Sequence, residues 1–352
     1  MRTHAAAVAL LAGALAAAPP AAAELPEMTV NAIGLNSRTV ASTVDEVPFW
    51  NEQIPEASDG RITAEFTPVD LSGVRDEQVM RMTTLGVVTF TSGDISKMAG
   101  DDPVFEGCDL AGLTLDIETA RAACDAWAPT MSRVMEEKFN IKLLGTGTNP
   151  PQVFWCREPI GGLDDLAGKK VRVFNQTMND FIGAVGGTTV SMPFAEVVPA
   201  LQRGVVDCAV TGTLSGNTAG WPEVSTHLYP MYLGWSINYQ SVNLDAWNSW
   251  PEEVQAFFTE QFEAFEDQMW ATGAKAVADA ENCNFNQDPC EMGSKVDMTL
   301  VEISEEDRER HKELMESVVL VEWGKRCGRD CAEEWNGTVG PVVGLEIPLD
   351  QL

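Results

Sequence analysis

Short apolar segments alternate with amphipathic segments twice along the chain, and this alternation restricts the fold more than any other feature. In the first half, strand patterns at 28–35, 60–69 and 87–94 are separated by helix patterns at 47–58 and 75–86. In the second half, strand patterns at 169–174, 188–194 and 205–212 are separated by helix patterns at 177–187 and 195–204. Strands and helices that alternate at this spacing form parallel sheets covered by helices. The sequence therefore predicts an α/β fold of two similar lobes with a cleft between them.

The last third of the chain is more helical. Apolar side chains recur at helical spacing over residues 249–280, with Ser249 as the expected N-cap and Glu252 at the capping-box position. A helix of this length can lie across both lobes. A second capped helix is expected to begin after Ser304.

Residues 1–23 have the pattern of a secretory signal peptide. A weakly basic start at Arg2 and His4 precedes an alanine-rich apolar run, and small residues Ala21 and Ala23 stand before Glu24. The alternative is an uncleaved membrane anchor. No later stretch is long and apolar enough for a membrane span, so the sequence predicts an exported, periplasmic protein.

The chain is strongly acidic, with 53 Asp and Glu against 23 Lys and Arg and a formal charge of −30. This balance argues against partners such as nucleic acid or anionic lipid. It also repels anionic ligands, so an anion site must be built from a few local cations and backbone donors.

Eight cysteines are typical of an oxidising compartment. Sequence proximity favours the disulfides Cys108–Cys124, Cys283–Cys290 and Cys327–Cys331. The two cysteines that remain give the fourth pairing, Cys156–Cys208. Because eight cysteines allow 105 pairings, this is a preference. The alternative is a metal site, which the sequence disfavours because it has three histidines and lacks a C-x-x-C pair.

Signals for catalysis or for a cofactor are weak. The sequence contains no nucleophile elbow, zinc-protease, P-loop or dinucleotide-binding motif, and we expect neither a cofactor nor a metal. His227 lies in a loop-like segment, and His311 lies among charged residues on a helix that we expect to be solvated. We therefore expect the protein not to be an enzyme.

Arg172 is the residue that most directly indicates a function. It stands between Val171 and Val173 in a strand that we expect inside a parallel sheet, where both faces are covered. A buried charge needs a partner, and open α/β sheets bind ligands at the carboxyl ends of their strands. A guanidinium also matches a carboxylate bidentately. A surface arginine and an internal salt bridge are the alternatives.

Three neighbouring strand ends are expected to meet at one rim. They bring together a cation, an amide, an aromatic ring and a hydroxyl, from Arg172, Asn175, Phe194, and Thr211 with Gly212. Such a set suits a small anionic ligand. The alternatives are core packing for Phe194 and a loop cap for Thr211.

The segments "LDDLAGKKVRVF", "VGGTTVSMPFAEVVPALQRGVVDCAVTG" and "NLDAWNSWPEEVQAFF" resemble the solute-binding proteins of tripartite ATP-independent periplasmic (TRAP) transporters, of the C4-dicarboxylate-binding type. The resemblance covers most of the chain and is densest from Gly162 to Phe258. It implies a two-lobed periplasmic-binding-protein fold, type II-like, with a long helix spanning both lobes. We expect one lobe to contain 24–150 and about 236–278, and the other 151–235 and about 279–352.

The resemblance also implies roles for individual residues. It implies that Arg172 clamps the carboxylate of a ligand when the lobes close, and that Asn175, Phe194 and Thr211 face that ligand. In the first lobe, Asn36 and Ser92 fall at pocket positions. An acid is frequent near Ser92 in sugar-acid binders of the family, and this chain has none there.

Trp155 and Trp235 are candidates for aromatic walls of the site, with core packing as the alternative. If both line the cleft, an aromatic or short aliphatic monocarboxylate is favoured over a polyhydroxylated acid. The function predicted is a periplasmic receptor that captures an organic acid and delivers it to TRAP permease subunits in the membrane. A ligand-sensing accessory protein and an exported enzyme of the same fold are the alternatives.

Overall fold

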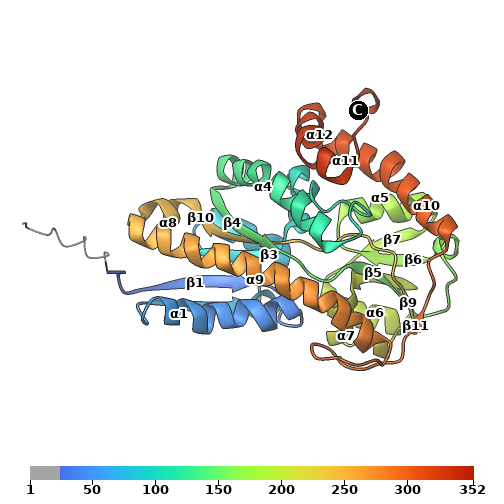
Figure 1. The fold of residues 1–352 in the computed structure, drawn as a ribbon, viewed down its shortest axis with the longest axis horizontal. Helices are drawn as coiled ribbons and strands as arrows, with labels where there is room; N and C mark the ends of the chain where they lie inside the picture. The colour runs from blue at the N-terminus through green and yellow to red at the C-terminus, as the bar shows by residue number, and fades with distance from the viewer. Residues whose placement is uncertain (1–23) are drawn as a thin grey trace, which may run out of the picture.

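The computed structural model describes residues 24–352, so the expected signal peptide at 1–23 lies outside the described residues. Within the described chain, no helix combines the length and the apolar composition needed to cross a membrane. Two mixed sheets lie side by side, and helices cover both of them (Figure 1). The chain thus has the two-lobed α/β fold expected from the sequence.

The first sheet contains five strands. In spatial order they are β2 (Ile62–Pro68), β1 (Met28–Gly34), β3 (Phe90–Asp94), β10 (Asn238–Asn243) and β4 (Ile141–Gly147). β1 pairs in parallel with β2 and β3, whereas β10 is antiparallel to both β3 and β4. The three parallel strands are those predicted in the first half of the sequence.

The second sheet contains six strands. In spatial order they are β11 (Thr299–Leu300), β9 (His227–Tyr229), β5 (Gln152–Cys156), β8 (Cys208–Gly212), β6 (Lys170–Val173) and β7 (Thr188–Ser191). β6 is parallel to both β7 and β8, as predicted, and β5 is antiparallel to β8 and β9. β6 therefore lies inside the sheet, with a neighbour on each side.

The chain crosses between the sheets after β4 and again after β9. The two crossing segments hydrogen-bond to each other, from Asn149 N to Trp235 O (3.2 Å) and from Gln152 N to Gly234 O (2.8 Å). These crossings lie near the lobe boundaries expected from the sequence. The full assignment of residues to lobes stays a prediction.

The helices surround the sheets and fill the connections between strands. They are α1 (Ile54–Ala57), α2 (Val69–Ser72), α3 (Asp76–Thr84), α4 (Ile117–Phe139), α5 (Gln176–Ala184), α6 (Val197–Gln202), α7 (Thr213–Thr218), α8 (Leu244–Ser249), α9 (Glu252–Asn284), α10 (Glu305–Leu314), α11 (Leu320–Cys327) and α12 (Arg329–Val343). Short 3₁₀ turns matter for the site: η3 (Ile95–Met98), η4 (Pro103–Glu106) and η6 (Phe194–Glu196).

The long helix α9 runs lengthwise past both sheets (Figure 1). Its first half packs aromatic residues into the core beside the first sheet, and its second half packs Ala276 and Ala280 against Leu214 of α7. The predicted start at Ser249 is wrong. Ser249 is the last residue of α8, and its Oγ donates to Ala246 O (2.7 Å). Pro251 holds Trp250 in an extended conformation, so α8 and α9 cannot form one continuous helix.

The C-terminal helices α10, α11 and α12 pack over the second lobe and α4. Ser304 is the N-cap of α10, as predicted, and its Oγ accepts from Asp307 N (3.0 Å). The prediction of a solvated His311 is wrong. His311 is 4% exposed because α10 presses it against Phe181, and its Nε2 lies 2.9 Å from Tyr232 O.

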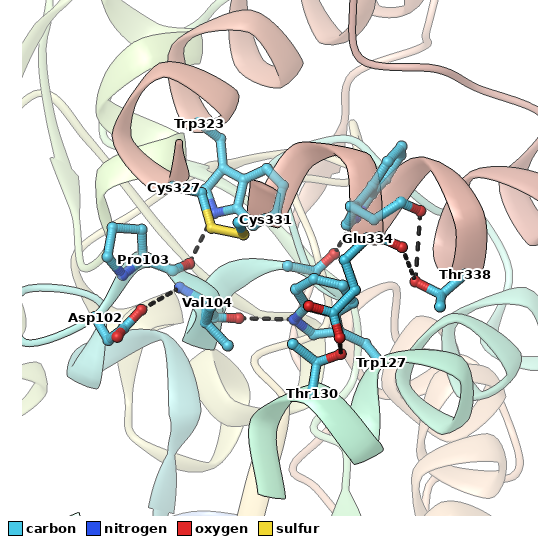
Figure 2. Close-up of a disulfide and its surroundings, with 12 residues drawn as sticks. Asp102, Pro103, Val104, Trp127, Thr130, Trp323, Cys327, Cys331, Glu334 and Thr338 are labelled. Carbon is cyan, nitrogen blue, oxygen red and sulfur yellow. Dashed lines mark hydrogen bonds between the residues drawn. A yellow bond between two sulfur atoms is a disulfide. The ribbon is translucent and has the colours of Figure 1, made fainter. Parts of the chain in front are cut away.

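Four disulfides are present, and they pair the cysteines as preferred from the sequence: Cys108–Cys124, Cys156–Cys208, Cys283–Cys290 and Cys327–Cys331. The Cys156–Cys208 bond joins directly opposed residues of β5 and β8. The Cys327–Cys331 bond clips the end of α11 to the start of α12 (Figure 2).

Candidate functional site

A cavity of about 100 Å³ lies between the two lobes, beside the crossing segments. Strand ends and loops of both lobes contribute to its wall. The residues that line it are Gly34, Leu35, Asn36, Thr39, Val69, Asp76, Val79, Ser92, Gly93, Asp94, Lys97, Met98, Asn149, Gln152, Arg172, Phe174, Phe194, Thr211, Ser215, Ser236, Asn238 and Tyr239. A space of this size has room for a small organic molecule.

Arg172 lies in the wall of this cavity and is 3% exposed. Its Nε and Nη2 donate to Met192 O (3.2 and 3.1 Å), and its Nη1 donates to Val210 O (2.8 Å). Phe174 covers one face of the guanidinium, with Cζ 5.3 Å from the ring centroid. Among residues 24–352, no carboxylate lies within salt-bridge distance of Arg172.

The charge of Arg172 is therefore buried without a paired anion. Burial lowers the pKa of Arg172 to about 10, while the more distant Asp94 and Asp76 act to raise it. The side chain stays protonated at neutral pH. A guanidinium has five N–H donors, and three of them reach the two carbonyl oxygens, so one N–H on each of Nη1 and Nη2 remains for a ligand.

The three strand ends expected to share a rim do lie together in space. Phe194 and Thr211 line the cavity beside Arg172, and the Phe194 ring stacks on Trp221 with centroids 5.5 Å apart. Asn175 and Gly212 are near but do not line the cavity. Each begins a helix, and the Asn175 side chain is used as the N-cap of α5, accepting from Met178 N (2.9 Å).

Asn36 and Ser92 of the first lobe also line the cavity. Behind Ser92 lies the buried carboxyl group of Glu46, which accepts from Ser92 Oγ and from Leu35 N (2.6 Å). Desolvation raises the pKa of Glu46 to about 7, although these two hydrogen bonds act to lower it. Two carboxyl groups thus lie near Ser92: that of Glu46, from a helical segment far away in the sequence, and that of Asp94, which lines the cavity two residues after Ser92. The expectation of no acid near Ser92 is wrong.

Trp155 and Trp235 do not line the cavity. Trp155 is fully buried against Trp221, and Trp235 is 1% exposed with its Nε1 donating to Thr114 Oγ1 (2.9 Å). Both rings therefore pack in the core, which was the alternative to a place in the cavity wall. Strand β5 directs Trp155, and the second crossing segment directs Trp235, away from the cavity. The aromatic side chains that do line the cavity are Phe174, Phe194 and Tyr239.

Several polar residues of the wall escaped sequence reasoning. Asp94 ends β3, and its carboxylate accepts from Ser96 N (2.9 Å) and Ser236 Oγ, while Lys97 pairs with Asp76. Asn149 comes from the first crossing segment, and Asn238 is the first residue of β10, directly after the second crossing. Asp94 could have been found as a polar residue at a parallel strand end. The two asparagines carry no such signal, because only the fold brings the crossings together.

A family model described as "Bacterial extracellular solute-binding protein, family 7" matches residues 38–323. The Vibrio cholerae protein named "Sialic acid-binding periplasmic protein SiaP" is 25% identical over 189 residues, which are 53% of this chain and 59% of that protein. The chain spans little more than half the length of the first curated relatives it matches, at 56% and 57%.

Solved structures share the fold over nearly the whole described chain. One is Bordetella pertussis DctP7, an extracytoplasmic solute receptor binding pyroglutamic acid, with a TM-score of 0.75 and 17% identity over 89% of this chain and 99% of that one. Another is a TRAP solute-binding protein from Rhodoferax ferrireducens with bound malonate, with a TM-score of 0.76 and 16% identity over 90% and 98%.

Proposed function

Because the chain belongs to the bacterial extracellular solute-binding protein family 7, we propose that it captures a small organic carboxylate in the periplasm and delivers it to the membrane subunits of a TRAP transporter. The observation that carries the proposal is the buried, unpaired guanidinium of Arg172 in the wall of the inter-lobe cavity. The ligands of the two structural neighbours, pyroglutamic acid and malonate, are small carboxylates and agree with it.

In this proposal the ligand carboxylate completes the ion pair that Arg172 lacks. Its two oxygens accept from the N–H groups that Nη1 and Nη2 still have free, in a bidentate arrangement. Lys97, the other cation among the lining residues, is already paired with Asp76, and Asp94 would repel a second carboxylate. A carboxylate therefore has one favourable position in the cavity, beside Arg172.

The size and the walls of the cavity narrow the ligand further. A space of about 100 Å³ between Phe174, Phe194 and Tyr239 favours a short acid over a polyhydroxylated sugar acid. We propose that Thr211, Ser92 and Asn36 contact the part of the ligand beyond its carboxylate. Closure of the two lobes over the ligand would then remove it from solvent.

A thermal-shift panel of short organic acids, each measured beside its uncharged methyl ester, tests this function. We expect one or more acids to raise the melting temperature and their esters to have no effect, because the esters cannot pair with Arg172. Equal stabilisation by acid and ester would contradict carboxylate recognition. Mass spectrometry of ligand retained through purification provides an independent identification.

The delivery step has a separate test. Genes for TRAP membrane subunits beside the gene for this chain would support transport. If those genes are missing and a signalling gene stands in their place, the sensing alternative is favoured instead.

A further inference from the structure

The chain makes a sharp turn in the second crossing between the lobes, just before β10. Within this turn (residues 234–237, the crossing turn), Gly234 has a φ of +114° and Ser236 has a φ of +51°. Ser236 is thus in the left-handed region, which a residue with a Cβ atom seldom adopts. Such a conformation persists only where the surrounding structure holds it, and it is concentrated at functional and switch segments.

Asp109 holds the crossing turn and does not line the ligand cavity. Its side chain is buried, and its carboxyl oxygens accept from Trp235 N (2.8 Å) and Ile237 N (3.4 Å), the amides on either side of Ser236. A Cβ atom on Gly234 would lie 2.8 Å from Asp109 Oδ1, so the glycine permits this close approach. In the described chain, no Lys, Arg or His side chain is within salt-bridge distance of Asp109. The turn itself therefore supplies the donors for this buried carboxyl group.

Ser236 connects the crossing turn to the wall of the ligand cavity. Its Oγ donates to the Asp94 carboxylate (2.5 Å), and both residues line the cavity. Ser236 O accepts from Asn149 Nδ2 (3.1 Å) in the first crossing, and Ile237 O accepts from Ile95 N (2.9 Å) directly after β3. A rotation of the backbone at Ser236 therefore moves the end of β3, the first crossing and the start of β10 relative to one another.

Two lobes change their relative orientation where the backbone of the connecting segments rotates, and a few residues usually absorb such a rotation. We propose that the crossing turn is a pivot for closure of the lobes and that Asp109 is its positioning residue. Asp109 contacts no ligand. By holding the amides of Trp235 and Ile237 it sets the φ of Ser236, and Ser236 in turn orients Asp94 in the cavity wall. The inference rests on the proposed function, because closure of the lobes serves the capture of a ligand.

Asp279 provides a matched control for Asp109. Its side chain is also buried, and its carboxylate also accepts from two backbone N–H groups, those of Glu291 (2.7 Å) and Met292 (2.8 Å). These residues lie at the end of α9 and in the loop after it, outside the crossing turn and outside the wall of the ligand cavity. Asp109→Asn and Asp279→Asn thus remove the same kind of interaction, and both should lower the melting temperature. Only Asp109→Asn acts on the proposed pivot.

Small-angle X-ray scattering of the intact chain without ligand tests the pivot. In Asp109→Asn, one oxygen becomes an NH₂ group that faces a backbone N–H, so the crossing turn is no longer held at both amides. We expect the radius of gyration of this variant to differ from that of the native chain, and that of Asp279→Asn to equal it. Native scattering from folded Asp109→Asn would show that Asp109 only stabilises the fold, and would overturn the pivot.

Calorimetry tests the positioning role, with lactate, pyruvate, malonate and pyroglutamate as probes. For the acid that binds the native chain most tightly, we expect Asp109→Asn to weaken binding about 3- to 30-fold, the range for substitutions that act on a site without touching its ligand. Asp279→Asn should change the affinity by less than about twofold. Equal affinities of the two variants for this acid would overturn the positioning role.

Ser236→Gly and Ser236→Ala keep the inference testable if Asp109→Asn does not fold. Both variants lose the Oγ bond to Asp94, but only glycine adopts a φ of +51° without a steric cost. We therefore expect Ser236→Gly to melt at the same temperature as Ser236→Ala or above it. A lower melting temperature for Ser236→Gly would show that Ser236 is not held in the left-handed conformation, and would also overturn the pivot.

The outcomes separate this inference from the proposed function. If an acid binds the native chain and both asparagine variants equally, the positioning role of Asp109 is overturned and the Arg172 clamp stands. If none of the four acids binds the native chain, carboxylate capture fails, whereas the scattering of the chain without ligand still decides the pivot.

Discussion

Glu46 is a buried acid directly behind the ligand cavity, and its ionisation opposes folding. Desolvation raises its pKa to about 7 from an ordinary 4.5. The folded chain therefore binds this proton more tightly than the unfolded chain does. The contribution to stability is full below about pH 4.5 and is lost as the pH rises to about 7. Glu106 and Asp109 have pKa values raised in the same way, so their contributions add.

We predict that the melting temperature of the native chain falls between about pH 5 and pH 8, and that Glu46→Gln makes this fall smaller. The glutamine keeps an oxygen for Leu35 N, and its NH₂ group can donate to Ser92 Oγ. Melting curves across this pH range test the prediction. A variant with the same pH dependence as the native chain would show that Glu46 does not titrate there.

At the scale of single residues, the sequence could predict those that a strand end brings to a rim. Arg172, Phe194 and Thr211 follow from the parallel strand pattern alone, since parallel strands share one carboxyl edge. The direction of Trp155 and Trp235 could not be predicted, because either face of a buried strand accepts a large ring. Asn149 and Asn238 could not be found either, since a crossing segment and the start of β10 meet only in the folded chain.

At the scale of elements, the C-terminal helices hold the loop that supports the start of α5. Indole N–H groups of Trp323 in α11 and Trp335 in α12 donate to Pro103 O and Gly107 O (2.8 and 2.7 Å). Trp127 of α4 donates to Val104 O in the same loop (2.8 Å), and Figure 2 shows the bonds to Pro103 and Val104 beside the Cys327–Cys331 disulfide. In the same loop, Glu106 accepts from Gln176 N (3.0 Å), four residues after Arg172. These helices thus act on the site through the loop.

We predict that Trp335→Phe destabilises the chain by about 1–3 kcal/mol more than Trp221→Phe does. Both indoles are fully buried, but Trp335 Nε1 donates to Gly107 O, whereas Trp221 Nε1 has no partner within residues 24–352. The two substitutions remove similar volumes, so their difference isolates the hydrogen bond. Urea unfolding measures both, and equal losses would contradict a role for the Trp335 bond.

The element pattern was predictable where local signals agree and not where one residue overrides them. The parallel strands and the Ser304 cap follow from spacing and capping chemistry. The start of α9 could not be predicted from these signals, because Pro251 breaks an otherwise continuous helical pattern into α8 and α9. The short antiparallel strands β4, β5 and β9 needed partners distant in the sequence, which no local pattern reveals.

At the scale of the whole molecule, the proposed function requires a chain with a formal charge of −30 to capture an anion against its own field. Arg172 acts only at short range, whereas the acidic surface repels the ligand from a distance. We predict that the association rate constant for an organic acid rises when NaCl increases from roughly 20 to roughly 200 mM, because salt screens this repulsion. Stopped-flow tryptophan fluorescence measures the rate. A rate constant that falls with salt would show local attraction to be stronger.

The most direct test of the function is calorimetry of Arg172→Ala with the acid that stabilises the native chain most. We predict a loss of affinity of about 100-fold or more, because the ligand carboxylate would be buried without its partner. Arg172→Lys should recover part of it, since it keeps the charge but loses the bidentate geometry. Arg203→Ala, an exposed arginine of the same lobe, is the matched control. Undiminished binding of the acid by folded Arg172→Ala would contradict the carboxylate clamp.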